Sequence, residues 1–584
     1  MKLMNFFEKF FDEEKVSSSY EYYDEKTKSL KFSNASIYEY LRESIKDETD
    51  LYAINYFDTR ITYGELFRNI NLIAKSLKYL GVKRGDIVTI CMPNTPEAIE
   101  VFYAVNKIGA ISDMIHPLSS KREIVEYLKK SRSRILFLYD QNYKKVCDEL
   151  ESTDVYRTIL MSVSFSMPRL TKLFYDLSHP LKLESDEQTG TYLNWKEFLN
   201  LGYLYRTQTE TKIHHKSMAL ILHSGGTTGT PKGVMISNYS FNALARQGSI
   251  NVLGVEPCDK IVTVLPIFHG FGLGVCVHCP LSLKVEVILM PEFDPKRFAK
   301  IISKYEPQVL AGVPSLFDTL IHLPLFKGVD LSSLKYMISG GDSMSIEMET
   351  KINSFLKEHK SNIVLSKGYG MTESLAATIY TFEDSNKPGS IGTPMIGNHV
   401  VICKPNTIEK LENGVEGEIC VTGPTLMTGY YEEPAETQKV LKKHKDGKLW
   451  LHTGDSGYID DSGCVYFTGR LKRMIVSSGF NVYPNHVENI LAKHPKVKSC
   501  CVIGVPHPHK MKVLKAYIIL EDKFTPSVKI EAELRILCRE HLAGYSQPRE
   551  YEFVEDLPKT IYNKTDYKKL EREEERVYER RRKN

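Results

Sequence analysis

Residues 224–233 read S-G-G-T-T-G-T-P-K-G, and this segment is the most informative stretch of the chain. Four glycines allow the backbone to adopt positive φ and to approach a ligand closely. Four hydroxyls and the ammonium of Lys232 supply hydrogen-bond donors to an anion. The apolar run 218–222 predicts a buried strand before the segment, and residues 233–237 lead into a helical pattern capped by Asn238 or Ser240. The segment therefore predicts a phosphate-binding loop, with a plain surface turn as the alternative. It is not a Walker A loop, because Pro231 precedes the lysine and Gly233 follows it.

The composition indicates a globular protein with more than one core. A chain of 584 residues exceeds the size of a single hydrophobic core, so two or more domains are expected. The net charge of +4, from 77 basic and 73 acidic residues, argues against nucleic acid as a partner. Eleven scattered cysteines, an odd number, favour a reducing compartment, and a cytoplasmic location is expected. The run Cys276-Val277-His278-Cys279 is predicted to pack in the core rather than to bind a metal.

No stretch approaches the ~20 apolar residues that a membrane span needs. Residues 1–11 are rich in phenylalanine and leucine and predict a helix packed on its own domain. The alternative is an amphipathic helix that makes peripheral contact with a membrane or a partner.

Helix-like and strand-like segments alternate from residue 61 onward, which predicts an α/β fold with helices on the faces of parallel sheets. Strands are expected at 86–90, 262–265, 285–290 and 309–313, and a helix at 295–305. Short strands and tight turns around 413–419 predict a small β-rich subdomain. At 469–473 the predicted elements change again, from a strand-rich segment to shorter mixed elements and charged helices. We therefore expect a large N-terminal domain over 1–470, with two parallel-type sheets, and a small α+β domain over 471–584. Residues 153–208 are expected to be an insertion.

Four further motifs follow the first loop in sequence. They are G-Y-G-M-T-E-S at 368–374, W-L-H-T-G-D at 450–455, G-R at 469–470 and P-K-T-I-Y-N-K at 558–564. In this order and at this spacing the motifs resemble the adenylate-forming superfamily, which includes acyl-CoA synthetases, peptide-synthetase adenylation domains and firefly-type luciferases. The resemblance extends from about Tyr63 to Lys564.

The resemblance implies a two-step reaction. A carboxylate attacks the α-phosphorus of ATP and forms an acyl-adenylate with release of pyrophosphate, and a thiol then displaces AMP. Positioned cations and donors must stabilise the charge that develops on phosphate oxygens. The implied cofactors and co-substrates are ATP, Mg²⁺ and CoA.

The resemblance also implies residue roles. The implied nucleotide-binding residues are Ser224, Gly225, Gly226, Thr227, Thr228, Gly229, Lys232, Gly341, Asp342, Tyr369, Gly370, Thr372, Asp455 and Arg470. Among them, Tyr369 stacks on adenine, Thr372 touches the α-phosphate and Asp455 accepts the ribose hydroxyls. Glu373 is the implied Mg²⁺ ligand, since Mg²⁺ is commonly bound by one carboxylate and phosphate oxygens. The implied catalytic residues are Lys564, which bridges the carboxylate and the α-phosphate, and His269, which closes on the carboxylate.

In the superfamily the C-terminal domain is mobile and rotates between the two steps. Lys472 matches the hinge position, and Ser478, Gly479 and Phe480 match the turn that lines the pantetheine tunnel of CoA. The chain departs from the family pattern at Asn563, where glycine is usual, and at His507, where aspartate is usual.

The segment 266–273 precedes the acyl pocket in this superfamily, and here it contains no acidic residue. Activation of α-amino acids is therefore disfavoured, because the substrate ammonium would lack a carboxylate partner. The pocket residues implied by the resemblance are Phe271, Ala311, Gly312, Val313, Gly340 and Met371. Their apolar or small side chains favour a medium- or long-chain fatty acid or an aryl acid. Free CoA is the preferred acceptor, and a separate acyl carrier protein is the second. The alternatives in other classes are an inactive nucleotide-binding scaffold and a kinase or P-loop NTPase.

Overall fold

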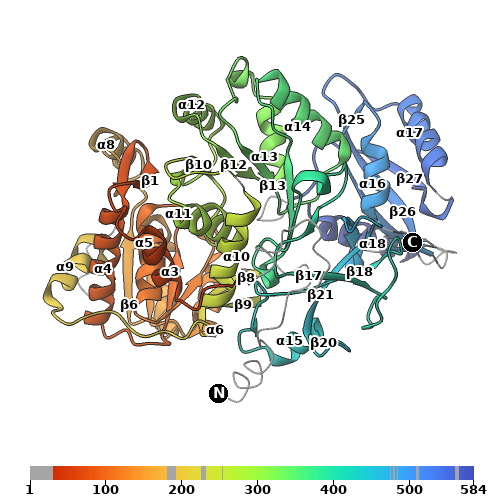
Figure 1. The fold of residues 1–584 in the computed structure, drawn as a ribbon. Helices are drawn as coiled ribbons and strands as arrows, with labels where there is room; N and C mark the ends of the chain where they lie inside the picture. The colour runs from red at the N-terminus through yellow and green to blue at the C-terminus, as the bar shows by residue number, and fades with distance from the viewer. Residues whose placement is uncertain are drawn as a thin grey trace.

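The computed structural model describes residues 31–180, 192–224, 232–252, 254–473, 475–477, 480–482, 484–507, 512–542, 544–559 and 565–583. Two large sheets with helices form most of the molecule, a smaller sheet follows them, and the C-terminal segment forms a separate unit (Figure 1). The predicted α/β class is confirmed. No helix within the described ranges combines the length and apolarity that a membrane crossing requires.

The first large sheet has eight strands in the order β19-β9-β8-β4-β3-β5-β6-β7. Its strands pair in parallel from β7 to β8, whereas β9 and β19 run antiparallel to their neighbours. Its strands are β3 (Ile87–Cys91), β4 (Ile111–Met114), β5 (Ile135–Tyr139), β6 (Arg157–Met161), β7 (Tyr192–Asn194), β8 (Met218–Ser224), β9 (Lys232–Ser237) and β19 (Gly429–Tyr430). The helices of this part of the chain are α3 (Ile37–Ile45), α4 (Tyr63–Tyr79), α5 (Pro96–Lys107), α6 (Lys121–Ser131), α7 (Tyr143–Val146), α8 (Arg169–Ser178), α9 (Trp195–Leu204) and α10 (Asn238–Asn251).

Two local expectations for this sheet are wrong. Residues 153–208 are not an insertion, because β6 and β7 extend the sheet and α9 packs against α4. The cap of α10 is neither Asn238 nor Ser240. Ser237, the last residue of β9, accepts a hydrogen bond from Ser240 N at 3.0 Å and caps the helix.

The second large sheet has nine strands in the order β16-β15-β14-β13-β12-β10-β11-β1-β2, parallel from β14 to β1. Its strands are β1 (Tyr52–Tyr56), β2 (Thr59–Thr62), β10 (Lys260–Thr263), β11 (Glu286–Leu289), β12 (Val309–Gly312), β13 (Tyr336–Ser339), β14 (Ser366–Tyr369), β15 (Ile379–Tyr380) and β16 (Thr393–Pro394). The helical segments between them are the π-helix η3 (Phe271–His278), α11 (Cys279–Ser282), α12 (Pro295–Tyr305), α13 (Pro314–Ile321) and α14 (Ile346–Glu358). Cys276, His278 and Cys279 are buried, as expected for core residues.

The β-rich subdomain is a five-stranded antiparallel sheet with the order β17-β18-β21-β20, in which β22 also pairs with β21. Its elements are β17 (His399–Cys403), β18 (Gly417–Thr422), α15 (Pro434–Val440), β20 (Leu441–Lys443), β21 (Leu449–Ile459) and β22 (Val465–Arg470). The β21–β22 hairpin brings Asp455 opposite Arg470.

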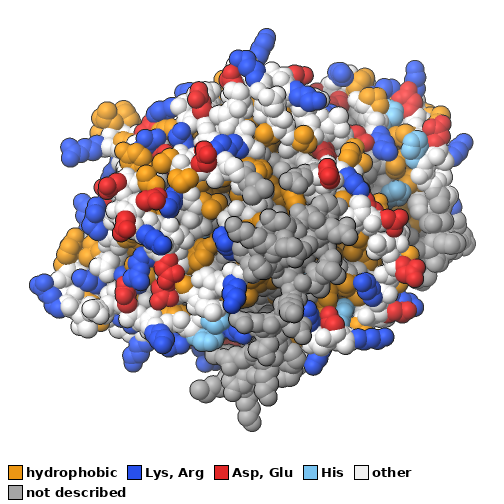
Figure 2. Space-filling view, viewed as in Figure 1, with side chains coloured by type: hydrophobic (Ala, Val, Ile, Leu, Met, Phe, Trp, Pro, Cys, Tyr) orange, Lys and Arg blue, Asp and Glu red, His pale blue; other side chains and the backbone are white. Residues whose placement is uncertain are grey.

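The C-terminal unit follows the short helix η7 (Leu471–Arg473) and has its own core, formed by buried residues between Ile475 and Leu542. Its elements are β23 (Ile475–Ser477), β24 (Phe480–Val482), α16 (Pro484–Ala492), β25 (Val497–Pro506), β26 (Lys512–Leu520), α17 (Val528–His541), β27 (Glu550–Phe553) and α18 (Tyr567–Lys583). On the face drawn in Figure 2, the described basic and acidic side chains are interspersed, in line with the small net charge.

Candidate active site

The β8–β9 hairpin holds the two ends of the glycine-rich loop together. Ser224 lies opposite Lys232, and the Ser224 hydroxyl donates to the Lys232 carbonyl at 3.5 Å. The Lys232 ammonium lies 2.5 Å from Glu436 Oε2 and 4.8 Å from the ring centroid of Tyr430. Hydrogen bonds from Lys232 and Lys439 lower the pKa of Glu436 to about 2. A cation is therefore fixed at the base of the loop.

Glu373 lies on the other side of Tyr430. It belongs to the short helix η5 (Thr372–Ser374), which contacts β8, and its side chain is buried. The Tyr430 hydroxyl donates to Glu373 Oε1 at 2.8 Å. Burial and the neighbouring Glu373 carboxylate raise the pKa of Tyr430 above its ordinary value. Tyr430 thus links the cation of Lys232 to a buried carboxylate suited to a hard metal ion.

A second carboxylate lies beyond Tyr369, the last residue of β14. The Tyr369 hydroxyl donates to Asp455 Oδ2 at 2.8 Å, and Arg470 Nε lies 3.4 Å from Asp455 Oδ1. Asp455 is buried, and the Phe467 ring lies 6.1 Å from the Tyr369 ring. Burial, followed by the charge of Asp455, raises the pKa of Tyr369 well above its ordinary value. The arrangement combines an aromatic face with a carboxylate that can accept hydroxyl hydrogen bonds.

Two glycines near these groups are required by the backbone. Gly341 has φ of +80°, a conformation that other residues rarely adopt. At Gly370 a Cβ atom would lie 2.1 Å from the Ala376 carbonyl oxygen. The exposed Asp342 next to Gly341 accepts a hydrogen bond from Ser343 N at 2.9 Å.

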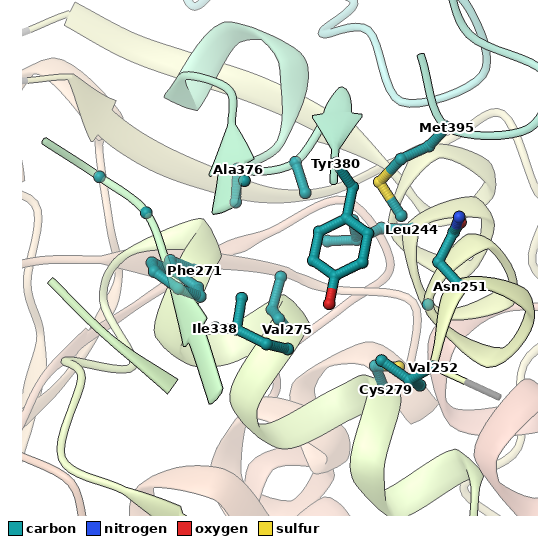
Figure 3. A pocket seen from close by; sticks show the side chains of 15 residues that line it. Leu244, Asn251, Val252, Phe271, Val275, Cys279, Ile338, Ala376, Tyr380 and Met395 are labelled. Atoms are coloured by element: carbon teal, nitrogen blue, oxygen red, sulfur yellow. The ribbon is translucent and has the colours of Figure 1, made fainter. Parts of the chain in front are cut away.

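An apolar pocket lies beside the Gly340–Gly341 turn. It has about 570 Å³ of empty volume, part of it open to solvent. Its walls come from α10, η3, α11, β13, the Gly340–Gly341 turn, β14, β15, Ala376, Ala377 and Met395. Figure 3 shows the Tyr380 ring projecting into this space, with Phe271 on one side and Met395 near its base. The residues that line the pocket include no charged side chain.

Two of the six expected acyl-pocket residues, Phe271 and Gly340, line this pocket. Gly312, the last residue of β12, instead faces the following helix α13, since a Cβ there would lie 2.5 Å from Leu316 Cδ2. The other three, Ala311, Val313 and Met371, are not among the lining residues. His269 lies in the turn before η3, where its carbonyl accepts a hydrogen bond from Leu273 N.

Several expected site residues lie outside the described ranges. They are Gly225, Gly226, Thr227, Thr228, Gly229, Ser478, Gly479, Asn563 and Lys564. The backbone of Lys472 lies in η7 and that of Phe480 in β24. Lys559 and Thr565 form an antiparallel bridge, which holds together the two ends of the segment that carries Lys564. His507 directly follows β25.

Three site features were not identified from the sequence. Tyr430 and Glu436, both in contact with Lys232, come from a segment about 200 residues further along the chain. His223 precedes the loop, and its Nε2 lies 2.6 Å from Asp113 on β4. In the sequence these residues are marked only by the G-Y-Y run at 429–431 and by a histidine after the apolar run 218–222. Neither pattern is specific for a binding site.

Comparison with known proteins identifies the family. Residues 41–431 match the AMP-binding enzyme family, and residues 486–564 match the AMP-binding enzyme C-terminal domain. A long-chain-fatty-acid–CoA ligase of Bacillus subtilis (strain 168) is 31% identical over 560 residues, which cover 95% of this chain and 97% of the relative. One from Haemophilus influenzae is 30% identical, with 92% of this chain and 95% of the relative covered. ATP-bound MatB from Rhodopseudomonas palustris shares the fold, with a TM-score of 0.81 at 22% identity over 94% of this chain and all of that one. The chain therefore belongs to the AMP-binding enzyme family, in the branch of the adenylate-forming superfamily that contains the AMP-forming acid–CoA ligases.

Proposed function

We propose that this ligase activates a medium- or long-chain fatty acid with ATP and transfers the acyl group to free CoA. The observation that carries the proposal is the pocket beside Gly340. Its lining has no charged side chain, so it suits an apolar tail whose carboxylate points out toward the nucleotide. The two relatives named above as long-chain-fatty-acid–CoA ligases support the same substrate class.

In the first step, the nucleotide lies along the contacts described above. The loop and Lys232 hold the β- and γ-phosphates, and Thr372 holds the α-phosphate. Asp455 and Arg470 hold the ribose, and Tyr369 stacks on the adenine. Contacts within the protein fix both charges, since Glu436 holds Lys232 and Tyr369 holds Asp455. Such preorganised charges stabilise a transition state without reorganising during the reaction.

Glu373 fits a role as Mg²⁺ ligand. It is a buried carboxylate, and Tyr430 fixes its orientation from one side. Mg²⁺ commonly binds through one or two carboxylates together with substrate phosphate oxygens. Bound there, it would supply positive charge to the phosphates.

The acid and the second substrate are handled by other residues. His269 closes on the substrate carboxylate, and Lys564 bridges that carboxylate and the α-phosphate. For the second step, the domain that begins at residue 471 turns about Lys472 and presents Ser478, Gly479 and Phe480 to the pantetheine arm of CoA. The separate core of this domain, from Ile475 onward, supports its motion as a unit.

The first test is a panel of fatty, aryl and amino acids offered with ATP, Mg²⁺ and CoA, with AMP and acyl-CoA as the measured products. We expect fatty acids to give the highest kcat/KM. A preference for aryl acids, as in the names of the 4-coumarate–CoA ligases related to this chain, would change the proposed substrate class but not the proposed reaction. Release of ADP, or no AMP with any acid, would refute the proposal.

The second test addresses Lys564. Lys564→Ala should abolish acyl-adenylate formation yet leave thioester formation from a pre-made acyl-adenylate within a few-fold of wild type. Lys559→Ala is the matched control, because Lys559 is an exposed lysine of the same segment. Unchanged ATP-dependent activation in Lys564→Ala would show that the role is misassigned.

A further inference from the structure

Thiol and imidazole groups converge in the β-rich subdomain, away from the apolar pocket. Cys403 ends β17, Cys420 lies in β18, and His444 follows β20. The two sulfur atoms and a ring nitrogen of His444 all lie within 4.8 Å of one another. Both cysteines are fully buried, and His444 is half-buried.

His452 and Glu418 extend this cluster. The Nε2 atoms of His444 and His452 are 3.0 Å apart. The other ring nitrogen of His452, Nδ1, lies 2.8 Å from Glu418 Oε2. A carboxylate that holds one nitrogen of a histidine while the other faces a metal is the usual second layer of a metal site.

The sheet register explains why these side chains meet. Cys403 pairs with Glu418, and Cys420 pairs with His452, across neighbouring antiparallel strands. Glu418 and Cys420 are two residues apart on one strand, so all four side chains share a face of the sheet. His444 joins them from the turn after β20, where its ring stacks on Trp450 at 5.2 Å.

We propose that Cys403, Cys420, His444 and His452 bind one Zn²⁺ ion, with Glu418 orienting His452. Two thiolates and two imidazoles are a donor set typical of structural zinc. Tetrahedral zinc, with bonds of about 2.0–2.3 Å, places neighbouring donor atoms about 3.3–3.8 Å apart. The group of Cys403, Cys420 and His444 lies within about 1 Å of this range. The nitrogen of His452 nearest Cys420 is Nδ1, 3.4 Å from the sulfur, so His452 joins the site by a rotation that turns Nε2 toward the metal.

The metal would stabilise a strand used by the active site. His452 precedes Asp455 by three residues on β21, and Glu418 Oε1 accepts a hydrogen bond from Gly454 N at 3.0 Å. A site at His452 therefore fixes β21 next to the carboxylate assigned to the ribose. Its role is structural, because four protein ligands leave no open coordination position for a substrate.

The test is zinc content of the full-length protein. The chain, kept reduced, is incubated with one equivalent of ZnSO₄, desalted into metal-free buffer and measured by mass spectrometry of the metal. We expect about one zinc per wild-type chain and about a tenth of that in Cys403→Ser and in His444→Gln. Cys464→Ser is the matched control, since Cys464 is a buried free cysteine of the same subdomain outside the cluster. It should retain the wild-type content.

Cobalt substitution of the wild type gives a readout that does not depend on how the variants fold. Tetrahedral Co²⁺ with two thiolates should show intense visible bands together with sulfur-to-cobalt charge transfer. Wild-type protein that retains less than a tenth of an equivalent of zinc would overturn the proposal. So would equal zinc in Cys403→Ser, or a Cys403–Cys420 disulfide in protein whose thiols were trapped at lysis.

Discussion

Asp455→Asn tests the assignment of the ribose site. In the variant one of the two acceptor oxygens becomes an amide nitrogen that donates, so one of the two ribose hydroxyls loses its acceptor. A hydrogen bond to a charged group contributes about 1.5–3 kcal/mol. Since about 1.4 kcal/mol corresponds to a factor of ten, kcat/KM for ATP should fall about 10- to 150-fold.

The assay is AMP formation at saturating acid and CoA with ATP varied. The Tyr369 hydroxyl, which donates to Asp455 at 2.8 Å, can still donate to the amide oxygen, whereas the contact with Arg470 loses its ionic partner. The protein should remain folded, and the melting temperature is measured alongside the kinetics. Asp460→Asn is the matched control, because Asp460 directly follows β21 of the same hairpin and pairs with Lys387. A kcat/KM for ATP within twofold of wild type in Asp455→Asn would refute the ribose assignment.

Two further predictions concern the pocket and a buried acid. Val275→Phe adds bulk inside the pocket and should lower kcat/KM for the longest accepted acid by about fourfold for each displaced methylene, at ~0.8 kcal/mol each. An equal fall in kcat/KM for short and long acids would contradict this prediction. Burial, followed by the charge of Glu97, raises the pKa of Glu100 to about 8. The contribution of this group to the free energy of unfolding is therefore fully present below pH 4.5 and is lost as the pH rises through 8. The loss has an upper bound of about 5 kcal/mol, and Glu100→Gln should narrow the wild-type drop in melting temperature from pH 5 to pH 8.5. An equal drop in both proteins would argue against this assignment.

Local patterns predicted much of the fold. The helix expected at 295–305 is confirmed by α12, because proline at its first position and Asp294 as cap are local signals. The strand–helix alternation likewise predicted parallel sheets with helices on their faces.

Features that depend on contacts distant in sequence were missed. Tyr430 reaches Lys232 only because β19 pairs with β9, and nothing in either segment specifies that pairing. The expected pocket included Gly312, which is small for a different reason, since it packs against Leu316. A small residue indicates close approach but not which element approaches it.

The pairing of β9 with β19 also has a consequence for biosynthesis. Strand β9 leaves the ribosome about 200 residues before β19, which at 5–20 residues per second is a delay of about 10–40 s. During this interval the nascent chain has a free sheet edge at β9, and Lys232 lacks both Tyr430 and Glu436. The nucleotide site is therefore completed late in synthesis, and ribosome-bound chains that end before residue 429 should not retain ATP.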